Sequence, residues 1–247
     1  MNLRKNVFYL FLMAIALYSC SPLTQLYETK STLPIDQRRN QFIFDNDTVR
    51  IEYNFWGDKG ILSFEIYNKL NTPIYIDWKK SSFIQNSQKF DYWINQTITN
   101  SAGYSVGYYR NSWLYQSTSA TSNPERILFL APKSFIKAER FNICSGASLL
   151  SKNSQMATIS VPEHPGKMIK IKHQDYELTS SPLVFRNFIT YSLTEKFENE
   201  SYINNIFYVS KIYEMKRSEF LNKVIQVDRR TRFVSSFSNP SFFYVNL

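Results

Sequence analysis

Glycine, cysteine and histidine are all scarce in this sequence. Its 247 residues include 6 glycines, 2 cysteines and 2 histidines. So few glycines argue against the glycine-rich loops that cradle phosphates, and the turns must rely on Asn, Asp, Ser and Pro. The histidines, His164 and His173, are not spaced as a metal-binding pair. We therefore predict no bound metal and no cofactor.

Signatures of catalysis are weak. The segments at 144–146 and 146–148 do not match the elbow of a serine hydrolase. Cys144 is predicted to be a small buried hydrophobe, because a nucleophilic thiol needs a positioned base. We predict that the protein is not an enzyme and has no catalytic residues. A hydrolase whose carboxylates meet only in the fold remains the alternative.

The longest uncharged apolar run lies near the start of the chain. Arg4 and Lys5 precede about 11 apolar residues, Val7 to Leu17. This is the length of the hydrophobic region of a signal peptide, whereas a helix that crosses a membrane needs about 20 residues. Residues 1–19 are therefore predicted to be a signal peptide, and the mature protein to be exported.

The stretch Leu17-Tyr18-Ser19-Cys20 resembles a bacterial lipobox. Leu17 and Ser19 match the pattern, whereas Tyr18 stands where a small residue is usual. The resemblance implies cleavage before Cys20, diacylation of Cys20 and permanent attachment to a membrane, since each buried acyl methylene contributes about 0.8 kcal/mol. An ordinary cleaved signal followed by a chance cysteine is the alternative.

The formal net charge is +9. A basic exported protein can favour lipid headgroups or acidic glycans, although a solvated surface tuned for solubility is the simpler interpretation. The densest basic clusters are Lys167–His173 and Asp228–Arg232, and the first alternates as one face of a strand does. No nucleic-acid partner is predicted for an exported protein.

Alternating apolar and polar residues dominate the middle of the chain. Thr48–Phe55 and Ile61–Asn68 both alternate, with a short loop at Trp56–Gly60 between them. Such segments predict half-buried antiparallel strands joined as a hairpin. We predict a single mainly β domain over residues 41–247, an antiparallel β-sandwich with one short helix near 217–227. An immunoglobulin-like topology is one possible arrangement of its strands. Residues 20–40 are predicted to carry the lipid and act as a tether, a short strand at Gln25 to Lys30 within it being the alternative.

Residues 100–124 change in character and are predicted to form a loop or excursion. They are rich in Tyr, Ser, Asn and Gly, a composition typical of binding loops. Our hypothesis is that five aromatic side chains here contact a glycan or a protein partner: Tyr104, Tyr108, Tyr109, Trp113 and Tyr115. The alternative is that these side chains cover the core of the sandwich.

Three parts of the chain carry a more specific likeness: FDNDTVRIEYNFWGDKGILSFEIYNKLNTPIYIDWKKSSFI, the turn Ala131–Ser134, and SPLVFRNFITYSL followed by INNIFYVSKI. They resemble a family of uncharacterised Bacteroidota-type outer-membrane lipoproteins without an assigned activity. The resemblance implies lipidation and a β fold. Asp47-Thr48-Val49 also resembles the O-glycosylation site of such bacteria, which implies a glycan on Thr48. The alternative is that this tripeptide only begins a β-strand. Surface-exposed lipoproteins of such bacteria tend to carry acidic residues directly behind the lipidated cysteine, so the resemblance, with no acidic residue at 21–25, implies the periplasmic face over the cell surface.

Taken together, these features predict a lipid-anchored lipoprotein of the outer membrane. We expect it to act as a non-catalytic binding or structural module of the envelope, with the membrane as its first partner and a glycan or an envelope protein as its second. An envelope hydrolase acting on glycan or peptide is the competing class.

Overall fold

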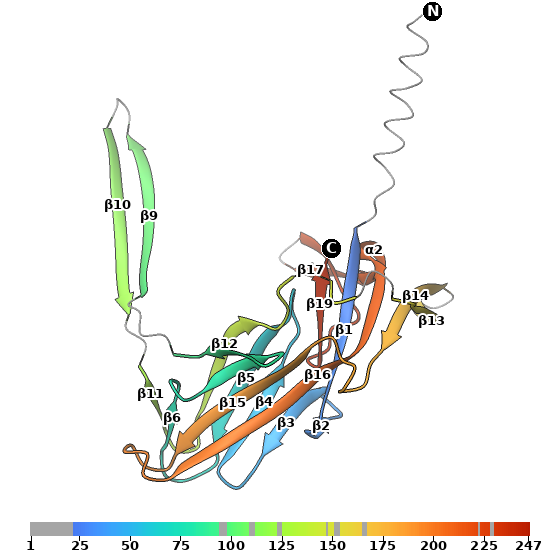
Figure 1. The fold of residues 1–247 in the computed structure, drawn as a ribbon. Coiled ribbons are helices and arrows are strands. Elements are labelled where there is room, and N and C mark those ends of the chain that lie inside the picture. The colour runs from blue at the N-terminus through green and yellow to red at the C-terminus, as the bar shows by residue number, and fades with distance from the viewer. Residues whose placement is uncertain are drawn as a thin grey trace, which may run out of the picture.

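The structure is a computed structural model and describes residues 22–93, 98–108, 112–122, 125–146, 148–150, 154–164, 167–221, 223–227 and 230–247. For 98–108, 112–122, 162–164, 167, 224–227 and 230–233 it describes the backbone alone. The fold is mainly β and antiparallel, as the alternation predicts (Figure 1).

Two sheets form the body of the molecule. The larger sheet runs in the order β11-β6-β15-β16-β1-β19, and off this path β7 pairs with β15 and β8, and β14 pairs with β16 and β13. Its strands are β1 (Leu23–Ser31), β6 (Ile74–Asp77), β7 (Ser82–Gln85), β8 (Gln88–Asp91), β11 (Ile127–Leu130), β13 (Ala157–His164), β14 (Lys167–Asp175), β15 (Val184–Ser192), β16 (Glu200–Lys216) and β19 (Phe242–Asn246).

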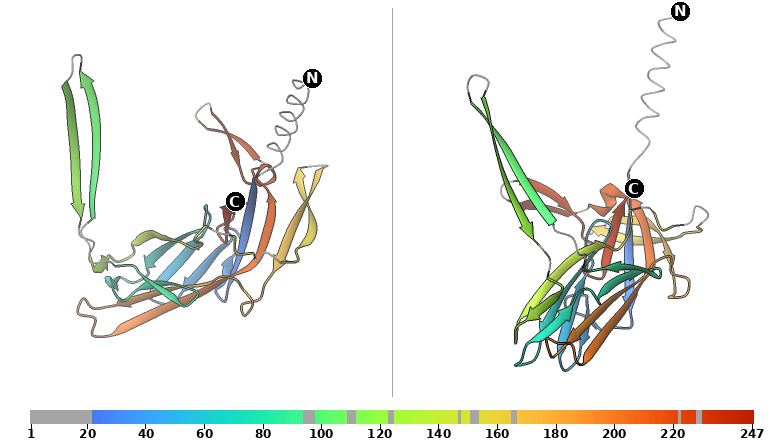
Figure 2. Two further views of the ribbon diagram at one scale, coloured as in Figure 1. Left: turned by 45° about the horizontal axis from the view of Figure 1, so that its top comes forward. Right: turned by 60° about the vertical axis from the view of Figure 1, so that its left-hand side comes forward.

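The smaller sheet runs in the order β12-β5-β4-β3-β2 and lies against the larger one (Figures 1 and 2). Its strands are β2 (Ile35–Asp36), β3 (Gln41–Asp45), β4 (Val49–Asn54), β5 (Ile61–Asn68) and β12 (Phe135–Asn142). Two hairpins stand outside these sheets. They are β9 (Ile98–Tyr108) with β10 (Ser112–Ser122), and β17 (Lys223–Val227) with β18 (Arg230–Val234).

The core lies between the two sheets, and the alternation of the strands determines which residues enter it. In β4, Val49, Ile51 and Tyr53 are buried, whereas Arg50 and Glu52 are partly exposed. Aromatic rings from both sheets pack there, and the largest fully buried ones are Tyr27, Tyr53, Tyr92, Phe55, Phe64, Phe83, Phe185, Phe207 and Phe243. The sandwich-like architecture predicted from the sequence is therefore confirmed.

A buried polar network ties the two sheets together through this core. The Tyr53 hydroxyl of β4 accepts hydrogen bonds from the side-chain amides of Asn187 in β15, at 3.2 Å, and Asn205 in β16, at 2.7 Å. The Tyr92 hydroxyl donates to Asn187 at 2.8 Å. Because buried polar groups are stable only when paired, the network fixes how the sheets align.

The predicted tether over residues 20–40 is wrong from Leu23 onward. Strand β1 begins at Leu23 and lies between β16 and β19, antiparallel to both. Its residues 24–27 are all buried. The strand shows no alternation because both of its faces are covered: Tyr27 enters the main core, and Leu26 enters a second cluster with Ile171 and Met215.

Two further predictions need correction. The helix expected near 217–227 is α2 (Arg217–Phe220) and ends there, since Lys223–Val227 forms β17 and pairs with β18. The loop expected at 100–124 is the long hairpin of β9 and β10, with eleven paired positions from Ile98↔Ser122 to Tyr108↔Ser112. The strand predicted over the basic cluster Lys167–His173 is confirmed as part of β14.

Candidate functional site

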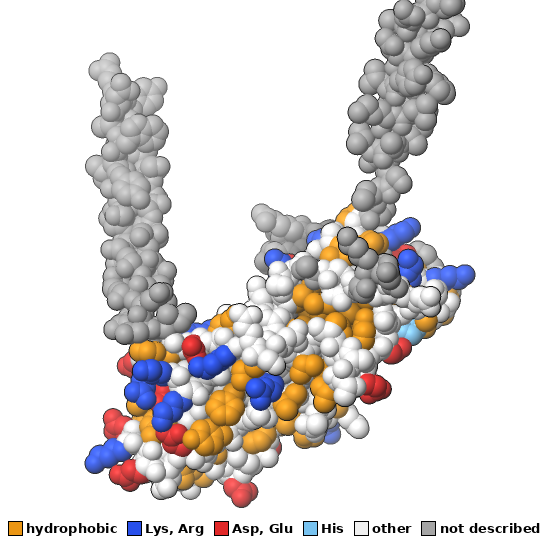
Figure 3. All heavy atoms as spheres, viewed as in Figure 1, with side chains coloured by type: hydrophobic (Ala, Val, Ile, Leu, Met, Phe, Trp, Pro, Cys, Tyr) orange, Lys and Arg blue, Asp and Glu red, His pale blue; other side chains and the backbone are white. Residues whose placement is uncertain are grey.

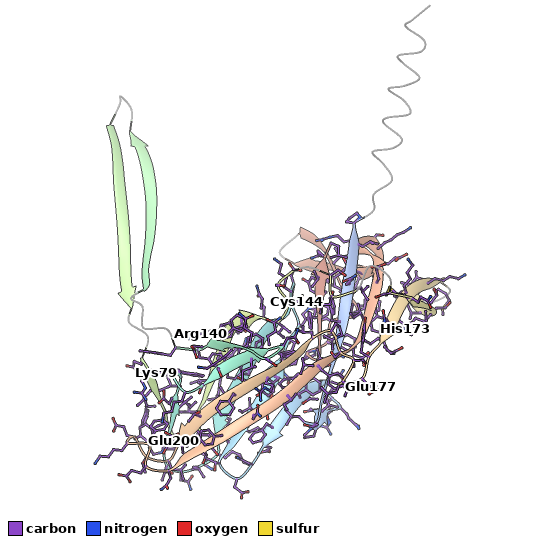
Figure 4. All side chains as sticks on the ribbon, in the orientation of Figure 1. Lys79, Arg140, Cys144, His173, Glu177 and Glu200 are labelled. Atoms are coloured by element: carbon purple, nitrogen blue, oxygen red, sulfur yellow. The ribbon has the colours of Figure 1, made fainter. Side chains whose placement is uncertain are left out.

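A cavity of about 380 Å³ lies at the end of the sandwich near the base of the β9–β10 hairpin. Three strand ends form it. Trp78 follows β6, Tyr92 and Trp93 follow β8, and the residues from Ile136 to Arg140 belong to β12. Glu125 and Leu128 complete the wall. Figure 4 shows Lys79 and Arg140 on this side of the molecule.

An ion pair fixes the position of Trp78. The Asp77 side chain is only 1% exposed and accepts two hydrogen bonds from Arg126, at 2.7 and 3.2 Å. Its carboxylate also accepts from the backbone N–H groups of Lys79 and Lys80. Burial alone would raise the pKa of Asp77, but the guanidinium and these N–H groups together lower it below its usual range. Trp78 itself donates its backbone N–H to the carbonyl of Arg126 at 2.9 Å.

The floor of the cavity is rigid, because Tyr92 belongs to the buried polar network. Its ring is 1% exposed and lies 5.5 Å from the ring of Trp78. Trp93 continues the aromatic surface, and the ammonium of Lys79 lies 5.6 Å from its ring centroid. These rings provide a preformed apolar surface with cations beside it.

Charged groups of β12 form the rim. Glu139 pairs with Lys137 at 2.5 Å and accepts a hydrogen bond from the Ser63 hydroxyl at 3.1 Å. The hydrogen bond from Lys137, followed by that from Ser63, lowers the pKa of Glu139. A general acid for glycoside cleavage needs a raised pKa. Glu139 is therefore suited to accepting hydrogen bonds from a ligand and unsuited to donating a proton.

The aromatic residues predicted to bind a partner do not share one face. In the register of β9 and β10, Tyr104 pairs with Gln116 and Tyr108 with Ser112, whereas Trp113 pairs with Gly107. Since successive strand positions alternate between faces, Tyr104 and Tyr108 lie on one face and Trp113 and Tyr115 on the other. Tyr109 lies outside the described residues. The register does not test the hypothesis that these residues contact a glycan or a protein partner, so it stays a prediction, as does the alternative that they cover the core.

One motif escaped the reasoning from sequence. Gly103-Tyr104-Ser105-Val106-Gly107 matches the G-x-S-x-G pattern of serine hydrolases. That pattern works as an elbow only where a strand turns sharply into a helix. Here Ser105 lies inside β9, opposite Tyr115, and the strand continues to Tyr108. The backbone context of a nucleophile elbow is therefore lacking.

Cys144 and His173 are far from the cavity (Figure 4). Cys144 is fully buried, and burial raises the pKa of its thiol, as expected of a structural cysteine. His173 lies 3.1 Å from Asp175, which Lys211 also contacts at 2.9 Å. Within the described ranges, no three His, Cys, Asp or Glu side chains gather as metal ligands would.

Two predicted modification sites lie near the ends of strands. Cys20 itself is outside the described residues, which begin at Pro22, directly before β1. Thr48 lies in the turn between β3 and β4, half-buried, with its N–H bonded to Asn46. In the part of the chain that the structure describes, no helix has the length and hydrophobicity required to cross a bilayer.

The chain matches none of the family models, curated proteins or solved structures with which it was compared. The cavity was not predicted from the sequence, because its lining comes from segments distant along the chain. The one local signal was a tryptophan shortly after each of two strands, Trp78 and Trp93.

Proposed function

We propose that this protein is a lipid-anchored lipoprotein of the outer membrane, attached through Cys20, that binds an envelope glycan without chemical conversion. The observation that carries the anchor is the placement of Cys20. It stands three residues after the end of the apolar run at 7–17 and three residues before Leu23, where β1 begins. An acyl group there requires no change in the sandwich.

The anchor is tested on the protein purified from membranes. Mass spectrometry of the N-terminal peptide is expected to show a mature chain that starts at an acylated Cys20. The Cys20→Ala variant is expected to keep its leader and to lack acyl groups. A mature wild-type chain that starts elsewhere, or carries no acyl group at Cys20, contradicts the proposal.

The aromatic cavity supports the binding role. Rings of Trp78 and Trp93 can receive the apolar face of a sugar, while Arg140 and Glu139 can bond to its hydroxyls or acidic groups. The lowered pKa of Glu139 speaks against the competing hydrolase, because a paired carboxylate is a poor proton donor. A glycan therefore suits the cavity better as a ligand than as a substrate.

Binding is tested by titrating the protein with soluble envelope glycans and following tryptophan fluorescence. Arg140→Ala is expected to weaken binding about tenfold, equivalent to the loss of one charged contact. Arg38→Ala removes an exposed arginine that lies outside the cavity and should change nothing. Equal effects of both variants, or no fluorescence change with any glycan, would refute the cavity as the binding site.

A further inference from the structure

The start of β1 is tied into the fold on both of its edges. The Pro22 carbonyl accepts a hydrogen bond from the Arg217 N–H at 2.9 Å, and the Leu23 carbonyl accepts one from the Leu247 N–H at 3.0 Å. Leu23 also stands opposite Lys216 in the register of β1 and β16. The chain is therefore held by backbone hydrogen bonds from Pro22 onward.

This geometry brings the domain close to the anchor that we propose at Cys20, on which the inference rests. Two Cα–Cα steps of 3.8 Å join Cys20 to Pro22, a reach of about 7–8 Å. The headgroup layer on each side of a bilayer has a thickness of the same order. Whichever way the linker bends, the end of the domain around Pro22 must lie at the lipid surface.

The residues exposed at this end, which we call the anchor end, are basic and apolar. Leu23 and Leu247 are exposed, and so are Lys216, Arg217 and Lys223. The acidic groups nearby are engaged internally. Glu214 accepts from Gln25 at 3.1 Å, and Glu219 accepts from the Lys216 N–H at 2.9 Å.

Strand β14 adds a second row of basic residues. Its register places Lys172 opposite Glu214, so residues 167–171 lie level with the end of β16 or beyond it. Ile169 and Ile171 are buried beneath it with Leu26, Met215 and Phe220. The alternate positions Met168, Lys170 and Lys172 are therefore exposed.

The two densest basic segments of the sequence thus flank the anchor. The first lies in β14, and the second includes Arg230 and Arg232 of β18. Both hairpins lie at the end of the molecule where β1 begins (Figure 2). In Figure 3, Lys and Arg side chains are visible at this end, at the upper right, and others lie at the lower left.

We propose that the anchor end docks on an anionic lipid surface, with Lys170, Lys216, Arg217 and Lys223 facing the headgroups and Leu23 and Met168 reaching between them. Each basic residue near an anionic leaflet adds attraction that falls off within a Debye length. The acyl chains hold the protein at the membrane. The basic surface then sets its orientation and leaves the cavity, whose lining includes no residue of β1, open to the envelope.

The test uses the mature lipidated protein, reconstituted into phosphatidylcholine vesicles with or without phosphatidylglycerol. Lysine acetylation is read by mass spectrometry. We expect Lys170, Lys216 and Lys223 to react about threefold or more slowly on the anionic vesicles, and high salt to reverse this. Lys30, at the far end of β1, and Lys196, in the β15–β16 connection, are exposed controls that should react equally on both.

A charge-reversed variant provides the second arm. Lys216→Glu with Arg217→Glu should abolish the protection of Lys170 and Lys223, whereas Lys30→Glu with Lys196→Glu, an equal change in charge, should preserve it. An acylated protein whose anchor-end lysines react equally on both vesicles overturns the docking and leaves the anchor standing. An unacylated Cys20 overturns the anchor and the docking with it.

Discussion

Arg126 holds Asp77 through two hydrogen bonds, from Nη2 at 2.7 Å and from Nε at 3.2 Å. The pair joins the end of β6 to the residue just before β11, so it closes the sheet at the point from which the β9–β10 segment departs. The carboxylate is buried, while the guanidinium is 45% exposed. Solvent therefore screens the charge of Arg126 but not that of Asp77.

Asp77→Asn should lower the free energy of unfolding by about 2 kcal/mol. The value is below that of breaking a fully buried ion pair, because Arg126 can still be solvated and the amide can still accept from Lys79 and Lys80. Urea denaturation measures the change. Asp91→Asn removes a carboxylate that pairs with Lys89 at 2.5 Å and is 50% exposed, and it should cost much less. Equal losses of stability in Asp77→Asn and Asp91→Asn would contradict a stabilising role for the buried ion pair of Asp77.

The same pair predicts how stability depends on pH. The pKa of Asp77 is lowered in the folded state, so its contribution is complete above the ordinary Asp pKa of about 4 and disappears as the pH falls through the lower folded value. The difference in unfolding free energy between wild type and Asp77→Asn should be constant from neutral pH to about 5 and shrink below 4. A difference that grows on acidification would contradict the assignment.

Tyr53 supplies the acceptor that two buried amides share. Tyr53→Phe leaves the Nδ2 groups of Asn187 and Asn205 without this partner, and a buried donor that loses its partner costs about 1–3 kcal/mol. We expect a loss of about 3 kcal/mol in urea denaturation. Tyr202→Phe also removes a hydroxyl, but the side chain is 59% exposed. It should change stability by less than about 0.5 kcal/mol, and a similar loss in both variants would refute the network's role.

Gly60 closes the hairpin between β4 and β5 in a left-handed conformation, with φ of +66°. A Cβ at this position would lie 2.8 Å from Phe243 Cγ and 3.1 Å from Ile143 Cβ, both in the core. Gly60→Ala should therefore cost about 2–3 kcal/mol, from backbone strain and overpacking together. Gly57→Ala meets nothing closer than Ile61 at 3.4 Å and is the matched control. Thermal unfolding distinguishes the two, and equal melting temperatures would contradict the clash.

The strands that the sequence predicted are those with one buried face. In β4 and β5 the alternation is visible because one side meets the core and the other is more exposed. The apolar residues Phe220, Leu221, Val224 and Ile225 fit a helical period, yet β17 pairs with β18 instead. A local period does not show whether a segment pairs with the one that follows it, so the helix could not be limited to four residues from the sequence.

The candidate site could not be predicted from the sequence for a related reason. Trp78, Trp93 and Glu139 come from three separate segments. Nothing in the sequence predicts that these segments, at β6, β8 and β12, meet in the fold. The composition of residues 100–124 drew attention to the neighbouring hairpin instead. Its strands, ITNSAGYSVGY and SWLYQSTSATS, do not alternate apolar and polar residues, which hides eleven-residue strands behind a loop-like composition.

A mutation in β1 distinguishes the core strand seen in the structure from the tether predicted from the sequence. Tyr27 is fully buried, its ring stacks on Phe243 with centroids 4.8 Å apart, and its hydroxyl donates to Gln25. Tyr27→Ala should lower the free energy of unfolding by about 3–5 kcal/mol, as removal of a core aromatic ring does. A residue in a tether would change it by less than about 0.5 kcal/mol.

Two milder variants of β1 still distinguish a folded strand from a tether if Tyr27→Ala does not fold. Tyr27→Phe preserves the stacked ring and loses the hydrogen bond to Gln25, so it should cost about 1 kcal/mol. Leu23→Ala, at the exposed end of the same strand, should cost less than about 0.5 kcal/mol. Equal stability of Tyr27→Phe and Leu23→Ala in urea denaturation would mean that residues 23–31 are a tether. The docking of the anchor end would then fail as well, because the short link from Cys20 depends on β1 being folded.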